Sequence, residues 1–125
     1  MIPVNAPLFI SNEKKYLVQC IDSGWISSEG PFVQEFEKRF AAFCGRKYGV
    51  AVSSGTAALE VAMGVLGLKP GDEVIMPTFT IISCPLAVIQ YGLIPVFVDA
   101  DPETWTIDTT KIEEKITKRT KAIMP

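Results

Sequence analysis

Segments typical of strands alternate with segments typical of helices from residue 48 onward. The strand-like segments span 48–52, 73–76, 94–98 and 121–124. The helix-like segments between them span 55–67, about 80–91, and a stretch capped by Asp108 that carries Ile112 and Ile116. This order favours a parallel or mixed sheet with helices on both faces, because parallel strands need crossover connections. The sequence therefore predicts an α/β fold with a mostly parallel sheet.

The first 45 residues predict two helices. Ser11 can cap a helix that Gly24 ends, and Pro31 suits the first turn of a second helix. Large apolar residues follow one face of the second helix: Phe32, Val33, Phe36, Phe40 and Phe43. We expect this stripe to pack in a core, and Glu35 to pair with Arg39 on the other face.

A Ser-Ser-Gly-Thr sequence joins the first strand-like segment to the helix that follows it. Residues 53–56 stand where free backbone N–H groups coincide with the positive end of a helix dipole. Such a helix start can bind a phosphate group, with Gly55 allowing close approach and Thr56 adding a hydroxyl donor. Alternatively, Ser54 or Thr56 simply caps a buried helix, which is the commoner role of these residue types. The residues alone leave both interpretations open.

Composition narrows the chemistry that is available. The 125 residues suffice for one domain, and a net charge of −2 without a basic block points to neither nucleic acid nor an anionic membrane as a partner. The absence of histidine excludes a Ser-His-Asp or Cys-His mechanism within these residues and removes the commonest metal ligand, so no metal site is expected. Cys20, Cys44 and Cys84 are predicted to be reduced core residues of a cytoplasmic protein.

The helix-like segment 55–68 is apolar on nearly every side. A helix of this kind is buried on several faces, so we expect further protein to cover it. The chain also stops at Pro125, directly after a strand-like segment. We expect either a short fold closed by an edge strand or the first part of a longer chain.

Five motifs occur in an order and spacing that resemble one enzyme family. They are Gly-Trp-Ile-Ser-Ser-Glu-Gly-Pro at 24–31, Val-Ser-Ser-Gly-Thr-Ala-Ala-Leu at 52–59, Pro-Gly-Asp-Glu-Val-Ile at 70–75, Pro-Thr-Phe-Thr at 77–80 and Pro-Val-Phe-Val-Asp at 95–99. The chain is similar to the N-terminal part of the DegT/StrS-type sugar-nucleotide aminotransferases, and among these to the perosamine synthetase group. The resemblance extends over about residues 2–125.

The resemblance implies the fold type I aminotransferase large domain and pyridoxal 5′-phosphate as cofactor. Residues 1–125 would be a single incomplete domain, with N-terminal helices over 1–45 and the start of the α/β cofactor-binding domain over 46–125. The whole enzyme would transfer an amino group from glutamate to a nucleotide-linked 4-keto-6-deoxy sugar. It would act as a homodimer in the cytoplasm.

The resemblance also implies which residues bind the cofactor. Gly55 and Thr56 would hold the cofactor phosphate, with Ser54 beside them. The residue packed on the pyridine ring would be Ile81, where many relatives have an aromatic residue, or Phe79. The alternative for Phe79 is a core aromatic without contact to a ligand.

Trp25 and Ser27 are expected to contact the substrate, because the loop 24–30 is similar to one near the active-site mouth. The alternative is a plain linker between two helices.

The Schiff-base lysine and the acid that pairs with the pyridinium nitrogen are expected beyond residue 125, so the chain alone would be inactive. Three alternatives stay open: a sugar-nucleotide dehydratase of the same fold with histidine in place of the lysine, a non-catalytic phosphate- or nucleotide-binding module, and a truncated product without function.

Overall fold

The computed structural model describes residues 2–3 and 5–125. These residues form two compact units, of which the first ends at Ala51 and the second spans Val52–Pro125. That both units belong to one incomplete domain, divided between residues 45 and 46, stays a prediction.

The first unit contains two helices, α1 (Glu13–Ser23) and α2 (Pro31–Phe43). Gly24 ends α1 with a φ of 73°, a left-handed conformation that glycine adopts without steric cost, and Pro31 opens α2. Both features were predicted. The predicted cap at Ser11 is wrong, because Asn12 is the N-cap and the Ser11 amide donates to the Glu13 side chain instead.

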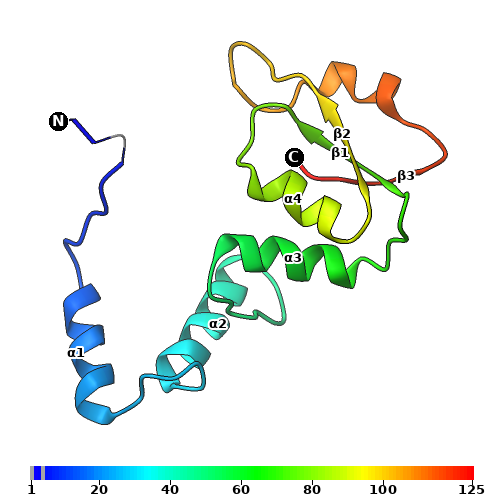
Figure 1. Ribbon diagram of the computed structural model, residues 1–125. Coiled ribbons are helices and arrows are strands. Elements are labelled where there is room, and N and C mark those ends of the chain that lie inside the picture. Colours follow the sequence, from blue (N-terminus) through cyan, green and yellow to red (C-terminus); the bar gives the residue numbers. More distant parts are fainter. Residues whose placement is uncertain (1, 4) are drawn as a thin grey trace. The chain divides into compact units, whose positions relative to one another are not determined.

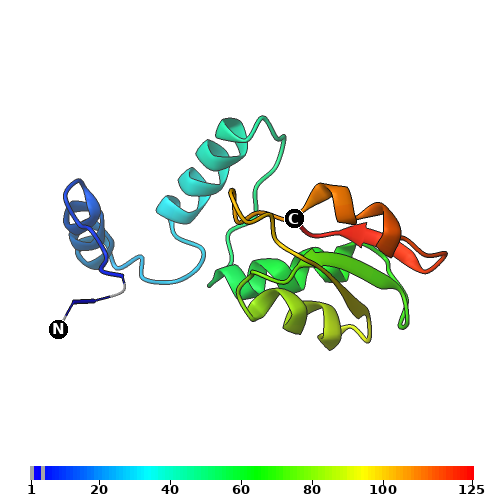
Figure 2. The same cartoon turned by 90° about the horizontal axis from the view of Figure 1, so that it is seen from above.

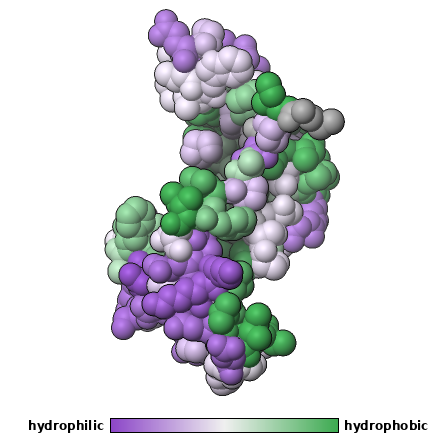
Figure 3. Space-filling model, turned by 90° about the vertical axis from the view of Figure 1, so that its left-hand side faces the viewer, coloured by the Kyte–Doolittle hydropathy of each residue, from purple (hydrophilic) through white to green (hydrophobic). Residues whose placement is uncertain are grey.

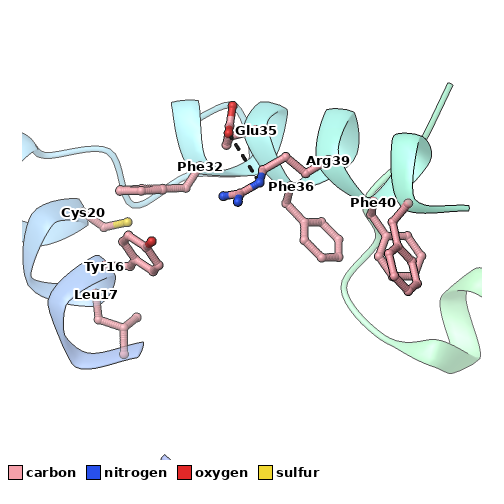
Figure 4. A pocket seen from close by; sticks show the side chains of 9 residues that line it. Tyr16, Leu17, Cys20, Phe32, Glu35, Phe36, Arg39 and Phe40 are labelled. Carbon is pink, nitrogen blue, oxygen red and sulfur yellow. Dashed lines mark ion pairs between the residues drawn. The ribbon is translucent and has the colours of Figure 1, made fainter. Parts of the chain in front are cut away.

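The aromatic stripe of α2 is exposed rather than packed in a core. The exposed fractions of Phe36, Phe40 and Phe43 are 55%, 54% and 86%. The predicted core packing is wrong for these residues, because two helices alone provide no second layer over the stripe. The stripe instead lines an open cavity of about 680 Å³ between α1 and α2 (Figure 4). The predicted ion pair forms, with 3.8 Å between Arg39 Nε and Glu35 Oε1.

The second unit is built on a three-stranded parallel sheet. Its strands are β1 (Glu73–Pro77), β2 (Ile94–Val98) and β3 (Thr120–Ile123), in the spatial order β2-β1-β3. Helices α3 (Gly55–Val65) and α4 (Ser83–Gln90) lie on one face, and the short 3-10 helices η1 (Thr109–Lys111) and η2 (Glu113–Lys115) lie on the other (Figure 1 and Figure 2). The predicted α/β fold with a parallel sheet is confirmed.

The core of the second unit is centred on β1. Val74 and Met76 pack with Val88 on the face that α3 and α4 cover. Ile75 points to the opposite face and packs with Val98. Because residues of a strand alternate between faces and both faces of β1 are covered, Val74, Ile75 and Met76 form a continuous apolar run after Glu73.

Three predicted elements differ from the structure. The segment 48–52 is not a strand, because the amide of Ala51 donates to Glu37 Oε1 of α2 at 2.8 Å instead of pairing with a sheet. The helix predicted from about residue 80 begins at Ser83. The helix predicted after Asp108 consists of the two short 3-10 helices, since the two threonines that follow this cap are poor formers of an α-helix.

Burial is lower than predicted in α3 and around the cysteines. Met63 is buried at 7% exposure, but Val65 of the same helix is 76% exposed. Among the cysteines, Cys44 is exposed and Cys20 and Cys84 are partly buried, so the prediction that all three are core residues is wrong. The expectation that further protein covers α3 stays a prediction.

A buried carboxylate ties β3 to β1. Glu73, the first residue of β1, accepts hydrogen bonds at Oε1 from Arg119 Nη2 and Nε at 2.6 and 2.8 Å. Its Oε2 accepts from the hydroxyls of Thr117 at 2.6 Å and Thr120 at 3.3 Å. The Thr117 hydrogen bond, followed by that of Arg119, lowers the pKa of Glu73 below its ordinary 4.5. This network satisfies a charge that would otherwise be costly to bury.

Candidate functional site

The candidate site lies at the carboxyl edge of the parallel sheet. β1 and β2 both end there, with Pro77 in register with Val98, and α4 begins there (Figure 1). The connection from β1 to α4 is fixed at its start, because the Thr78 amide donates to the Val98 carbonyl at 2.8 Å. Ligands of open α/β sheets bind beyond the carboxyl ends of the strands. This edge is therefore where a ligand of the second unit is expected.

The start of α3 presents free hydrogen-bond donors. Ser54 is the N-cap, with extended backbone, and its hydroxyl accepts from the Ala57 amide at 3.2 Å. Within the described chain, the amides of Gly55 and Thr56 have no hydrogen-bond acceptor. A Cβ added at Gly55 would meet nothing within 4 Å, so the space beside this residue is open where a side chain would stand. Two free amides at the positive end of a helix fit an anion such as phosphate.

A second hydroxyl, which was not predicted, lies beside Thr56. Thr56 Oγ1 is 3.0 Å from Ser83 Oγ, the first residue of α4. The cap interpretation therefore applies to Ser54, whereas the Thr56 hydroxyl faces the start of another helix. Ser83 could not be found from the sequence, because 27 residues separate it from Thr56 and only the folded α3–α4 pair brings them together.

Phe79 and Ile81 occupy the connection between β1 and α4, and both are exposed, at 61% and 67%. The alternative that Phe79 is a core aromatic is therefore wrong for this chain. The ring of Phe79 contacts Trp105 in an edge-to-face pair with 5.1 Å between ring centroids. Trp105, which comes from the loop after β2, was also missed by the sequence analysis.

Charged residues gather beyond β2. Lys111 Nζ lies 3.5 Å from Asp99 Oδ2 and 3.3 Å from Asp108 Oδ2. The hydroxyl of Thr110 is the main cause of a lowered pKa at Asp108, which in turn is the main cause of a raised pKa at Lys111. Lys111 offsets part of the charge of the two carboxylates, and Asp108 caps η1, so both have structural roles.

Trp25 and Ser27 lie in the first unit, in the loop between α1 and α2. Both help to line a cavity of about 270 Å³ together with Phe32 of α2. The indole of Trp25 is 50% exposed, so it is only partly packed beneath the loop. A role in contacting substrate stays a prediction for these two residues.

Exposed apolar side chains interrupt the polar surface (Figure 3). The described residues contain no cluster of three or more His, Cys, Asp or Glu side chains able to hold a metal ion. No helix in the described part of the chain has both the length and the apolar character needed to cross a membrane.

The fold is shared with enzymes of known structure. A solved structure of Escherichia coli GDP-4-keto-6-deoxy-D-mannose-3-dehydratase with bound hydrated pyridoxal phosphate matches 97% of the chain with a TM-score of 0.87 and 35% identity, over 32% of that protein. The fold is that of the N-terminal part of the large domain of fold type I pyridoxal-phosphate enzymes.

The chain belongs to the DegT/DnrJ/EryC1/StrS aminotransferase family, whose model matches residues 8–125. A GDP-perosamine synthase of Caulobacter vibrioides is 49% identical over 99% of the chain and 33% of that enzyme. The GDP-perosamine synthase of Vibrio cholerae is 46% identical over 99% of the chain and 34% of that enzyme. The chain thus spans about a third of the length of these relatives. The resemblance inferred from the five motifs is confirmed.

Proposed function

We propose that this chain is the N-terminal part of a pyridoxal-phosphate-dependent aminotransferase that transfers an amino group from glutamate to a nucleotide-linked 4-keto-6-deoxy sugar. The observation that carries the proposal is 46–49% identity to GDP-perosamine synthases over 98–99% of the chain. The donor set at the start of α3 supports it independently. Two free amides and a hydroxyl suit a phosphate group.

The residues divide into three proposed roles. Gly55 and Thr56, with Ser54 beside them, bind the cofactor phosphate through amide and hydroxyl donors. Phe79 or Ile81 packs on the cofactor ring. In the loop of the first unit, Trp25 and Ser27 contact the substrate.

When bound, the cofactor supplies an electron sink for the amino-group transfer. The described residues contribute binding and orientation: donors for the phosphate and apolar groups for the ring. As the resemblance implies, we expect the lysine and the pyridinium acid that the reaction needs to lie beyond residue 125. We therefore expect the 125-residue chain alone to be inactive.

A dehydratase of the same fold is the second candidate, because the solved dehydratase matches the chain with a TM-score of 0.87. Its lower identity of 35%, against 49% for a perosamine synthase, favours the aminotransferase. A non-catalytic binding module is not favoured either, since the relatives that match nearly the whole chain are named as enzymes.

The first measurement is the intact mass of the protein in its source, where a mass well above 13.7 kDa is expected. The full-length protein is then incubated with GDP-4-keto-6-deoxymannose, glutamate and pyridoxal phosphate, and the products are identified by mass spectrometry. Gain of an amino group by the sugar nucleotide supports the proposal, whereas loss of a hydroxyl without amination identifies a dehydratase. Catalysis by the 125-residue chain alone would contradict the proposed division of roles.

The proposal includes a cytoplasmic homodimer for the full-length protein. Sedimentation analysis of that protein tests its oligomeric state, because a monomer at assay concentrations would overturn the proposed dimer.

A further inference from the structure

A hollow lies beside the carboxyl end of α2, within the first unit. Its volume is about 430 Å³, and small residues leave this space open, since Ala41, Ala42 and Gly49 help to line it. Gly49 lies so close to α2 that a Cβ added to it would stand 2.7 Å from the Glu37 carbonyl oxygen. A larger residue at position 49 would therefore push the segment after α2 away from the helix and change the shape of the hollow.

Three cations line this hollow: Lys38, Arg46 and Lys47. All three are exposed, and in the described part of the chain none of them forms an ion pair. By contrast Arg39, the neighbour of Lys38 in α2, pairs with Glu35 at 3.8 Å. The three positive charges of the hollow are therefore available to a ligand.

The dipole of α2 accounts for only part of this cluster. Arg46 and Lys47 follow the carboxyl end of α2, where a cation is favourable because the last carbonyls of a helix carry partial negative charge. Lys38 lies inside the helix, more than one turn before its last residue, and the effect of the dipole falls off within the last turn. The helix end therefore does not explain why Lys38 shares the hollow with the other two cations.

The charge of the hollow matches an anion with two or more negative charges. Lys38, Arg46 and Lys47 contribute three positive charges, and Glu37 is the one acidic residue that lines the hollow, which leaves a net charge of +2. The Glu37 carboxylate already has a partner, since its Oε1 accepts from the Ala51 amide at 2.8 Å.

The donors of the hollow are partly fixed without a ligand. Lys47 Nζ lies 5.0 Å from the centroid of the Tyr48 ring, and this cation–π contact holds the ammonium group. The backbone of Arg46 is fixed, because its amide donates to the Ala41 carbonyl at 2.8 Å. In the described chain, the amides of Tyr48 and Gly49 have no hydrogen-bond acceptor. Free backbone amides beside cations are typical of anion sites.

We propose that this hollow, which we call the basic pocket, binds a diphosphate group. Its cations come from two segments, α2 and the chain after it, so each of two linked phosphates can pair with a cation of its own. The inference goes beyond the proposed function, because none of these cations is among the residues proposed to contact the cofactor or the substrate. Inorganic pyrophosphate and nucleoside diphosphates both carry this group, and the test separates them.

The test measures the protection of single lysines from acetylation in the full-length protein. Acetylation of each lysine is quantified by mass spectrometry over a series of inorganic pyrophosphate concentrations. We expect pyrophosphate to reduce the labelling of Lys38 and Lys47 severalfold. Lys14 and Lys15 of α1 are the controls, because they are exposed in the same unit and lie outside the basic pocket. Their labelling should not change.

Charge substitutions test whether the cations act together. The dissociation constant is taken from the pyrophosphate concentration that halves the labelling of Lys38, so it reports on this pocket alone. Arg46→Gln should raise it by up to about fivefold, the range of an exposed ion pair, and Arg46→Gln with Lys47→Gln should raise it further. The control with the same change in charge is Lys14→Gln with Lys15→Gln, which should leave the dissociation constant unchanged.

Other anions identify the source of the diphosphate. Equal protection by guanosine diphosphate and pyrophosphate would show that the diphosphate alone is recognised, whereas tighter binding of guanosine diphosphate would show that the nucleoside contributes; both results support the proposal. Orthophosphate should protect Lys38 less, and equal protection by orthophosphate would overturn the diphosphate assignment. The proposal also fails if Lys38 and Lys47 are not protected, if they do not react even without ligand, or if Lys14 and Lys15 are protected equally. None of these results bears on the proposed function.

Discussion

Thr56 is the residue at which the two interpretations of the α3 start diverge. Ser54 caps the helix, so the Thr56 hydroxyl is not needed for capping and lies 3.0 Å from Ser83 Oγ. We expect Thr56→Val to weaken pyridoxal phosphate binding by about tenfold or more, since hydrogen bonds to charged groups contribute roughly 1.5–3 kcal/mol. Stability should change little. The affinity of full-length Thr56→Val for pyridoxal phosphate is measured by equilibrium titration, and Thr56→Ser, which keeps the hydroxyl, is the control. An unchanged affinity in Thr56→Val would contradict a phosphate contact.

We expect the stability of the second unit to fall at acidic pH because of Glu73. Hydrogen bonds from Thr117 and Arg119 hold the pKa of its carboxyl below 4.5 in the folded protein. The unfolded chain has the ordinary pKa and takes up the proton first as the pH falls. The stabilisation by Glu73 is therefore complete above about pH 4.5 and is lost as the pH falls through the lowered folded-state pKa.

Glu73→Gln tests this dependence. Loss of the carboxylate should lower the melting temperature at neutral pH, because the charge-assisted hydrogen bonds that Glu73 accepts from Arg119 and Thr117 are lost. It should also reduce the fall in melting temperature on acidification. The matched control is Glu114→Gln, because that side chain is 65% exposed and its ion pair with Lys115 spans 3.8 Å. Equal acid sensitivity of Glu73→Gln and the unmodified protein would be evidence against the role of this carboxylate.

The α3 start allows helix capping and phosphate binding to be tested separately. Ser54→Ala removes the hydroxyl that accepts from the Ala57 amide and should cost about 1 kcal/mol of stability. Ser54→Asp keeps a capping acceptor but adds a negative charge where a phosphate would bind. We expect Ser54→Asp to retain stability in urea denaturation and to lose affinity for pyridoxal phosphate. Retained affinity in Ser54→Asp would argue that the phosphate binds elsewhere.

Whether an element could be predicted depended on where its interactions lie. β1, α3 and the Gly24 terminus follow from local patterns: apolar runs, helical periodicity and a stop residue. The segment 48–52 has the same local pattern as a strand, but a strand also needs a neighbour, and Ala51 pairs with Glu37 instead. A local sequence pattern does not show whether the Ala51 amide pairs with another strand or with a side chain such as Glu37.

The residues of the candidate site could be predicted where they are neighbours in sequence, but not where folding brings them together. Ser54, Gly55 and Thr56 adjoin in sequence, so a single helix start identified them. Ser83 and Trp105 could not be identified, because folding brings them to Thr56 and Phe79 from separate connections. The positive φ of Trp105 also has no signature in a residue type that normally avoids it.

At the scale of the whole molecule, the two units differ in how they are stabilised. The second unit has a core on both faces of β1, with Val74, Ile75 and Met76 fully buried. In the described part of the first unit, Ala41 is the one buried hydrophobic residue. We therefore expect the first unit to need further protein over its apolar surfaces, whereas the second has a core of its own beside the candidate site.

The aromatic stripe of α2 makes this difference measurable. Phe36, Phe40 and Phe43 are more than half exposed and follow one face of the helix, and contiguous apolar surface of this kind is typical of a face that other protein covers. If the chain is the first third of an aminotransferase, the rest of that protein should cover the stripe. We expect a hydrophobic dye such as anilinonaphthalene sulfonate to bind the 125-residue chain and to bind the native full-length protein weakly.

Phe40→Ser should change the two proteins in opposite ways. In the 125-residue chain it removes exposed apolar area, so dye binding should fall and solubility should rise. In the full-length protein it removes a covered ring and should cost roughly 3 kcal/mol or more of unfolding free energy. Lys38→Ser, at an exposed position of the same helix, is the control and should affect neither measurement. Unchanged stability of full-length Phe40→Ser would show that the stripe stays open to solvent, and the first unit would then have to be stabilised in some way other than burial of its aromatic face.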